Sequence, residues 1–164
     1  MLPSDCKISV IMPAYNAASY IRQAAESVLQ QSYKNLELIV VDDGSRDGTA
    51  DIVRGIAEED KRVILIEQKN SGKPSIARNK GIARATGRYL SFLDSDDYWL
   101  PERVTKLVEG LESHPDWLAV FHDLRLVTQE GQPLGGTYLG NASFLEAASP
   151  YLTSLGQQWY ECSE

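Results

Sequence analysis

The 164-residue sequence contains only two cysteines and two histidines, and it has no long apolar run. Cys6 and Cys162 lie far apart without the spacing of a metal site, and two isolated cysteines favour a reducing compartment. No apolar segment approaches the length of a membrane span, and the first residues show no signal-peptide core. We therefore expect a cytoplasmic protein without a transmembrane segment. Peripheral contact with the inner face of a membrane is compatible with this expectation.

Positive charge is also scarce, since 16 Lys and Arg stand against 23 Asp and Glu and the net charge is −7. A protein with this balance is repelled by polyanions, which argues against nucleic acid as a partner. The charge is still compatible with a small phosphate ligand held through a metal ion. The length is enough for one domain with a hydrophobic core.

Short apolar runs alternate with amphipathic segments over the first two thirds of the chain. The runs are bounded by turn residues, and we expect them to form strands over 8–13, 36–41, 63–67 and 89–93. The segments between them predict helices, the first capped by Ser19 and the third closed by Gly87. This order predicts an α/β fold with a mostly parallel, Rossmann-like sheet flanked by helices.

After Pro115 the pattern changes to shorter apolar runs. We expect strands over 117–123 and 124–128, and a turn over 129–133 that leads into residues 134–140. The second strand and the residues after the turn should therefore form a C-terminal β-hairpin. From Asn141 onward no period is clear, and no element is assigned there.

Three loops of unusual composition, "PAYN", "DDGS" and "DSDD", leave the carboxyl ends of the expected strands, where parallel α/β sheets bind ligands. In the third loop Asp94 and Asp96 are two residues apart, so in an extended segment their carboxylates point the same way. Mg²⁺ and Mn²⁺ prefer oxygen ligands, and a divalent cation would relieve the repulsion between these groups. The alternative is a solvated turn in which Asp97 caps a helix.

Residues in the other loops also have two interpretations each. Asp43 directly follows the second strand, where its carboxylate can accept a hydrogen bond from a base or a ribose hydroxyl. The alternative is an N-cap region for the helix after Asp47. Tyr15 can stack on a base, or it merely packs against neighbouring loops. Lys73 and Arg78 can neutralise phosphate charge, or they form a solvated basic face.

Two segments together carry a resemblance that is more specific than any single motif. They are residues 9–49, "SVIMPAYNAASYIRQAAESVLQQSYKNLELIVVDDGSRDGT", and residues 72–104, "GKPSIARNKGIARATGRYLSFLDSDDYWLPERV". From about Lys7 to Asp123 the chain resembles the large inverting family of nucleotide-sugar glycosyltransferases with the GT-A fold. That family includes bacterial polysaccharide and cell-wall enzymes. The resemblance implies a GT-A type sheet, a nucleoside-diphosphate sugar as donor, and an acceptor hydroxyl that is glycosylated with inversion.

The resemblance also implies roles for single residues. Asp43 matches the carboxylate that reads the N3–H of uracil or thymine, and Lys73 matches a basic position near the diphosphate. Asp94 matches the ribose-side residue of the family's DxD motif, and Asp96 matches its direct ligand to Mn²⁺ or Mg²⁺. The donor site expected on this basis comprises Pro13, Ala14, Tyr15, Asp43, Lys73, Asp94, Ser95 and Asp96.

The sequence departs from the family pattern toward its end. In the family the general base lies in a later acidic motif on the acceptor side. The late acids of this chain, Glu146, Glu161 and Glu164, do not form a recognisable version of that motif, so we name no catalytic base. The resemblance implies a nucleotide-sugar (donor) binding part over 1–123 and the incomplete start of an acceptor-side part over 124–164.

We therefore expect a metal-dependent inverting glycosyltransferase that uses a UDP- or dTDP-sugar and a sugar or lipid-linked acceptor, in polysaccharide or glycolipid assembly. One alternative is a donor-binding half that cannot transfer sugar by itself and that forms a homo-oligomer through an exposed sheet edge or apolar patch. Another is a phosphatase of the haloacid dehalogenase type, in which an apolar strand also ends in DxD. That alternative leaves "PAYN" and "DDGS" unexplained.

Overall fold

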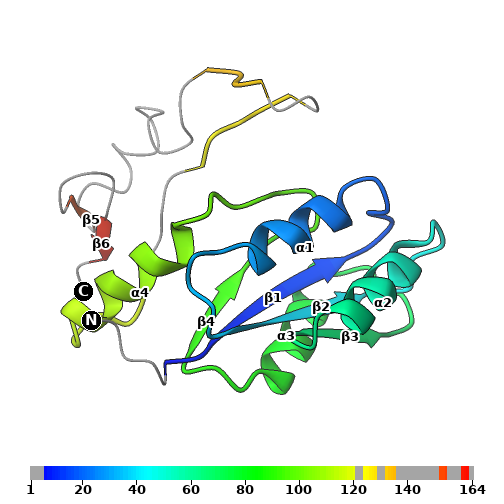
Figure 1. Cartoon of the computed structure of the whole chain (residues 1–164), viewed down its shortest axis with the longest axis horizontal. Helices are drawn as coiled ribbons and strands as arrows, with labels where there is room; N and C mark the ends of the chain where they lie inside the picture. The colour runs from blue at the N-terminus through cyan, green and yellow to red at the C-terminus, as the bar shows by residue number, and fades with distance from the viewer. Residues whose placement is uncertain (1–5, 121–123, 129–131, 136–151, 155–159, 163–164) are drawn as a thin grey trace. The chain divides into compact units, whose positions relative to one another are not determined.

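The computed structural model describes residues 6–120, 124–128, 132–135, 152–154 and 160–162 (Figure 1). The chain divides into two compact units, Met1–Lys106 and Leu107–Glu164. The first unit contains the whole parallel sheet and every predicted donor-site residue. Among the described residues, no helix has both the length and the apolar character that a membrane crossing requires.

The first unit is built on a four-stranded sheet in the order β3-β2-β1-β4, with every neighbouring pair parallel. The central strands, β1 (Ile8–Ala14) and β2 (Leu36–Asp42), are buried at every position. The outer strands, β3 (Val63–Glu67) and β4 (Tyr89–Phe92), are partly exposed. The prediction of buried strands is thus confirmed for the two central runs, which have covering elements on both faces.

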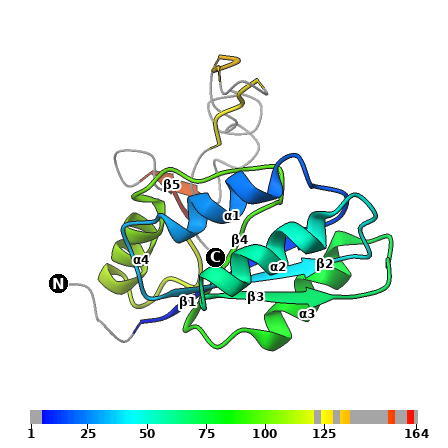
Figure 2. The same cartoon turned by 45° about the vertical axis from the view of Figure 1, so that its right-hand side comes forward.

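Helices cover both faces of this sheet, as Figure 2 shows. Helices α1 (Ile21–Leu29) and α2 (Thr49–Glu59) pack on one face, and α3 (Pro74–Arg84) packs on the other against β1 and β2. A fourth helix, α4 (Arg103–Ser113), follows β4 in the chain. The α/β class and the Rossmann-like parallel sheet predicted from the sequence are confirmed.

Two predicted helix ends are wrong. The residue before α1 is Tyr20, and no side chain caps this helix, so Ser19 is not its N-cap. Helix α3 ends at Arg84, and Gly87 does not close it. A Cβ atom on Gly87 would lie 2.5 Å from the backbone nitrogen of Ser9, so glycine is required there by close approach to β1.

Within the described residues, the predicted C-terminal hairpin is present as a short pairing. An isolated antiparallel bridge joins Val127 to Pro133, and the Leu134 N–H donates to the Leu126 carbonyl at 3.0 Å. Residues 117–120 and 124–128 do not form the predicted strands, while 121–123 and most of the predicted turn lie outside the described residues.

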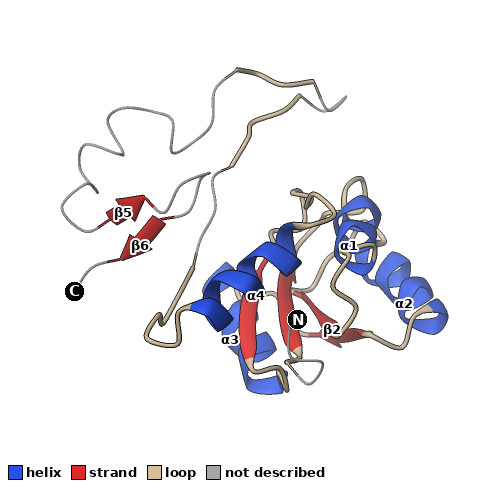
Figure 3. Cartoon of the chain, turned by 60° about the vertical axis from the view of Figure 1, so that its left-hand side comes forward, coloured by secondary structure: helices blue, strands red, loops and turns tan. Residues whose placement is uncertain are grey.

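A second antiparallel pair lies where the sequence showed no period. It consists of β5 (Leu152–Ser154) and β6 (Tyr160–Cys162), drawn as short arrows in Figure 3. Three residues in each strand are too few to show a hydrophobic period, which explains why this pair was not predicted.

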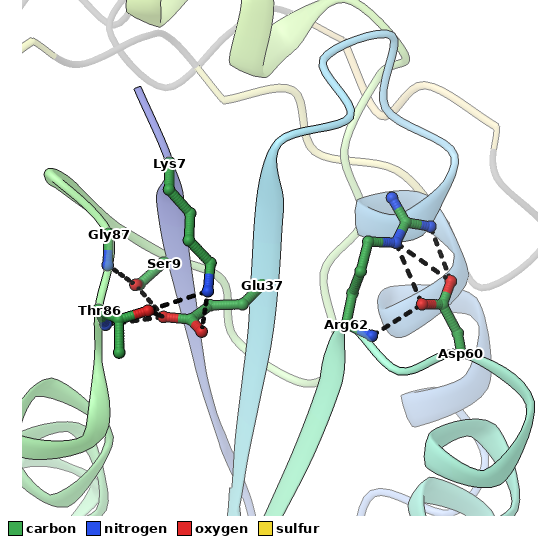
Figure 4. A network of polar contacts seen from close by, with 7 residues as sticks. All are labelled: Lys7, Ser9, Glu37, Asp60, Arg62, Thr86 and Gly87. Atoms are coloured by element: carbon green, nitrogen blue, oxygen red, sulfur yellow. Dashed lines mark hydrogen bonds and ion pairs between the residues drawn. The ribbon is translucent and has the colours of Figure 1, made fainter. Parts of the chain in front are cut away.

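A buried polar cluster joins the elements near the amino ends of β1 and β2 (Figure 4). The Glu37 carboxylate, which is 4% exposed, accepts hydrogen bonds from Lys7 Nζ at 2.6 Å and Ser9 Oγ at 2.6 Å. It also accepts the backbone N–H of Thr86 at 2.8 Å, which ties the segment before β4 to β2. Nearby, Arg62 pairs with Asp60 at 2.7 Å (Figure 4). These contacts fix the end of the sheet opposite to the predicted site.

Candidate functional site

The predicted donor-site residues other than Lys73 lie where β1, β2 and β4 end. Pro13 and Ala14 are the buried last residues of β1, and Tyr15 follows them with half of its surface exposed. The Asp43 N–H donates to the Ala14 carbonyl at 2.8 Å, which places the loop after β2 beside Tyr15. On the other side of β1, the Leu93 N–H donates to the Ile11 carbonyl at 3.1 Å. The loop that begins at residue 94 therefore leaves the same edge of the sheet (Figure 1).

The Asp43 carboxylate is buried and is hydrogen-bonded to the loop that follows β3. It accepts hydrogen bonds from Gln68 Nε2 at 2.5 Å, from the Ser71 hydroxyl at 2.9 Å and from the Ser71 N–H at 3.0 Å. Burial alone would raise the pKa of Asp43, but the bonds from Gln68 and Ser71 outweigh it and lower the pKa. Asp43 is therefore ionised at neutral pH and can only accept hydrogen bonds.

The helix-capping alternative for Asp43 does not fit the structure. The N-cap position of α2 is Gly48, and Asp47 accepts the hydrogen bond from the Thr49 N–H at 3.1 Å in the first turn. Asp43 faces Gln68 and Ser71 instead, two residues that the sequence analysis did not single out. Their position just after the carboxyl end of β3 is the signal that could have identified them.

The acidic loop after β4 is only partly neutralised by the protein. Arg78, from α3, forms an ion pair with Asp94 at 2.5 Å. Asp96 forms no hydrogen bond or ion pair with any described residue. Partial burial and the negative charges of Asp96 and Asp94 raise the pKa of Asp97. A concentration of negative charge therefore persists at Asp96, and Asp97 is not the cap of α4, which begins at Arg103.

These carboxylates fit a hard divalent cation, although they do not complete its coordination. The part of the chain that the structure describes holds no group of three or more His, Cys, Asp or Glu side chains able to bind a metal ion. Mg²⁺ in particular is commonly held by one or two carboxylates together with substrate phosphates and water. Asp96, with Asp94 two residues away, is a ligand of that kind, and a cation there would need its remaining ligands from another molecule.

Basic residues flank the same edge. Lys73 immediately precedes Pro74 at the start of α3, and its ammonium group has no ion-pair partner among the described residues. Arg78 lies one turn further along α3 and is held by Asp94. From the sequence, Arg78 fits a phosphate ligand and a solvated residue equally well. In the structure its guanidinium group pairs with Asp94 of the acidic loop.

Comparison with known proteins identifies the family to which the chain belongs. Residues 9–130 match the model of a family described as glycosyl transferase family 2. TuaG of Bacillus subtilis (strain 168), whose name marks it as a candidate teichuronic acid biosynthesis glycosyltransferase, is 40% identical over 127 residues. The match covers 77% of this chain and 50% of TuaG, so the chain spans about half the length of that relative.

Solved structures agree with the sequence match. S. aureus TarS 1–349 in complex with UDP-GlcNAc has a TM-score of 0.68 and 29% identity over 79% of this chain and 37% of that chain. The mannosyltransferase PcManGT from Pyrobaculum calidifontis, in complex with GDP-Man and Mn²⁺, has a TM-score of 0.63 and 26% identity. That alignment covers 79% of this chain and 38% of PcManGT. The chain belongs to glycosyl transferase family 2, and its sheet is of the GT-A type.

Proposed function

We propose that this chain carries the donor site of a metal-dependent inverting glycosyltransferase that takes its sugar from a UDP- or dTDP-sugar. The observation that carries the proposal is the convergence of Tyr15, Asp43 and the Asp94–Asp96 loop at the carboxyl ends of three neighbouring strands. The complexes of TarS with UDP-GlcNAc and of PcManGT with GDP-Man and Mn²⁺ support it by analogy.

The nucleobase would bind between the first two loops. Tyr15 is 51% exposed, and its ring can stack on a base, a contact worth about 1–3 kcal/mol. The ionised Asp43 carboxylate can accept the N3–H of uracil or thymine, whereas adenine offers no ring N–H at that edge. Pro13 and Ala14, which are buried at the end of β1, would support the site beside Tyr15.

The diphosphate would lie between the basic start of α3 and the acidic loop. Lys73 is free to pair with phosphate oxygens, and Asp94 and Ser95 lie toward the ribose in this proposal. A divalent cation held by Asp96 would neutralise charge on the diphosphate leaving group. Because Asp96 has no partner among the described residues, it can ligate a cation without breaking an existing bond.

Transfer itself requires an acceptor hydroxyl and a general base, neither of which we assign to a residue. The name of TuaG supports polysaccharide assembly as the process, with a sugar or lipid-linked acceptor. We propose that residues 1–123 form the donor-binding part and residues 124–164 the start of the acceptor side. We also propose a cytoplasmic location with peripheral membrane contact. The second candidate function is a donor-binding half without transfer of its own. Its support is that Asp42 and Asp43 are engaged by loop residues, while Asp94 and Asp96 are assigned to the donor.

Calorimetry with UDP, with and without Mn²⁺, tests the proposal. Wild-type protein should bind UDP much more tightly with Mn²⁺ present, and Asp96→Ala should weaken that binding by about 2 kcal/mol, the scale of losing a charged partner. Glu59→Ala is the matched control, because Glu59 is an exposed carboxylate on α2 away from the site. Metal-independent UDP binding that is unchanged in Asp96→Ala would refute the metal site, and absence of UDP binding would refute the donor site.

A further inference from the structure

Asn16, the residue after Tyr15, has an unusual backbone conformation. Its φ is +49°, and no other described residue except glycine has a positive φ. This left-handed region is sterically unfavourable for most L-residues, and Asn tolerates it better than others. A residue held in this conformation turns the chain sharply directly after Tyr15, so it decides where the Tyr15 side chain is presented.

Two reciprocal hydrogen bonds join Asn16 to the loop that carries Asp43. The Asn16 N–H donates to the Ser45 hydroxyl at 2.9 Å, and the Arg46 N–H donates to Asn16 Oδ1 at 2.9 Å. The Ser45 N–H in turn donates to the Asp42 carboxylate at 3.0 Å. Since Asp42 is 2% exposed and is the last residue of β2, the bridge is anchored in the sheet.

The bonds on the far side of Asn16 do not depend on its side chain. The Ala17 N–H donates to Thr49 Oγ1 at 2.8 Å, and the Ala18 N–H donates to Asp47 Oδ2 at 2.9 Å. These two bonds hold the start of α1 against the start of α2 whatever residue occupies position 16. Loss of the Asn16 side chain should therefore loosen the Tyr15 turn and leave the helices in place.

We propose that Asn16 is a positioning residue that sets base specificity, by fixing the Tyr15 ring relative to the Asp43 carboxylate. The proposal rests on the donor site described above. Stacking alone accepts any base, since every base has a π-face. Discrimination requires that the stacked base also present its N–H to Asp43, and this is met only if the two loops keep a fixed separation. The Asn16–Ser45–Arg46 bridge provides that fixed separation.

The chemistry of position 16 defines a set of variants. Asn16→Gly keeps the freedom to adopt a positive φ but loses the acceptor for the Arg46 N–H. Asn16→Ala loses both properties, whereas Asn16→Asp retains an acceptor oxygen and a tolerance for the left-handed region. Ser19→Ala is the matched control in the same loop, because the Ser19 side chain makes no hydrogen bond with a described residue.

The test measures UDP and ADP affinities by calorimetry for the wild type and these four variants, with Mn²⁺ present. Asn16→Ala and Asn16→Gly should weaken UDP binding roughly fivefold and reduce the ratio of UDP to ADP affinity, as expected for the loss of one hydrogen bond. Asn16→Asp should keep the wild-type ratio, as should Ser19→Ala. Melting temperatures of all variants show whether a loss reflects general unfolding, which would weaken both nucleotides equally.

The outcomes distinguish a failure of the Asn16 proposal from a failure of the proposed donor site. If the wild type prefers UDP and Asn16→Ala keeps the same ratio, the role of Asn16 is refuted while the donor site stands. An equal loss for UDP and ADP also refutes it, because a merely structural residue would behave in that way. If the wild type itself does not bind UDP, the proposed function fails and this inference fails with it.

Discussion

Replacement of Glu37 by Gln tests how strongly the buried polar cluster holds the sheet together. Glu37 is 4% exposed and accepts hydrogen bonds from Lys7, Ser9 and Thr86. Burial raises its pKa, but these bonds outweigh the effect and lower the pKa from 4.5 to about 2. Gln has nearly the same shape as Glu and removes the charge, but it also replaces one acceptor oxygen with a donor, so the pH dependence of its effect reports the contribution of ionisation.

The magnitude follows from this pKa difference. A pKa that falls from 4.5 to about 2 on folding corresponds to about 3 kcal/mol of stability at neutral pH. Because the Lys7 side chain is 37% exposed, screening by solvent makes this an upper bound. The folded-state pKa is the lower one, so the contribution is complete above pH 4.5 and is lost as the pH falls toward about 2.

Urea denaturation of the wild type and Glu37→Gln at several pH values provides the assay. We expect Glu37→Gln to lower the free energy of unfolding by up to about 3 kcal/mol at pH 7, and by progressively less below pH 4.5. As a control, Glu59→Gln replaces an exposed carboxylate on α2 and should have little effect on the free energy of unfolding at any of these pH values. A difference between Glu37→Gln and the wild type that is the same at pH 7 and at pH 3 would refute the assignment to charge.

Three further substitutions test the site and the stability of the fold. Asp43→Asn should reduce the preference for UDP over ADP, which we expect to be at least about tenfold in the wild type, and calorimetry that finds the preference intact would exclude Asp43 from base recognition. Gly81→Ala should lower the free energy of unfolding, because its Cβ would lie 2.6 Å from Ile11 Cγ2 and overpacking typically costs about 1–3 kcal/mol. Gly55→Ala on α2, where a Cβ meets nothing within 4 Å, should instead stabilise the protein by about 1 kcal/mol in the same denaturation experiment.

The central strands could be predicted from sequence because their environment is uniform. Every residue of β1 and β2 is buried, so these strands are apolar except at Ser9, Glu37 and the final Asp42, and the sequence marks them clearly. Once these strands and the helices between them are assigned, parallel pairing follows, and the loops after β1, β2 and β4 must meet at one edge. The place of Tyr15, Asp43 and Asp94 could therefore be inferred before any coordinates.

The contacts within the site could not be predicted in the same way. Gln68 and Ser71 reach Asp43 across a separation of more than 20 residues, and no local pattern specifies which donors a buried carboxylate will find. The positive φ of Asn16 depends on its bonds to Ser45 and Arg46 in another loop. Such features arise from the meeting of loops in three dimensions, whereas propensity and period describe only the local chain.

The two strands predicted over 117–123 and 124–128 are not formed in their described parts, for a related reason. Leu118 is 99% exposed, so its apolar character reflects no packing within the described part of the chain. A strand needs a partner on at least one side and a covering layer, and among the described residues the bridge at Val127 and Pro133 is not extended into a longer ladder. Apolar alternation identifies a strand only where a sheet is available to receive it.

The engagement of Asp43 raises a question about how it could read a base at all. An ionised carboxylate has about four acceptor positions, and Gln68 Nε2, the Ser71 hydroxyl and the Ser71 N–H already use most of them. A base N–H must therefore take the remaining position or displace one of these donors. Gln68 is the donor that can be displaced most readily, because its amide is carried by a side chain, whereas the Ser71 N–H is fixed by the backbone.

This argument predicts that Gln68 competes with the base for Asp43. Gln68→Ala should bind UDP at least as tightly as the wild type, and up to about fivefold more tightly, the equivalent of one net hydrogen bond. Gln23→Ala is the control, since Gln23 is an exposed amide on α1 that makes no hydrogen bond with a described residue. Calorimetry that shows UDP binding weakened more than fivefold in Gln68→Ala alone would contradict the competition. The Gln68 amide would then be needed to hold Asp43, and with it the loop that carries Lys73, in the orientation that receives the donor.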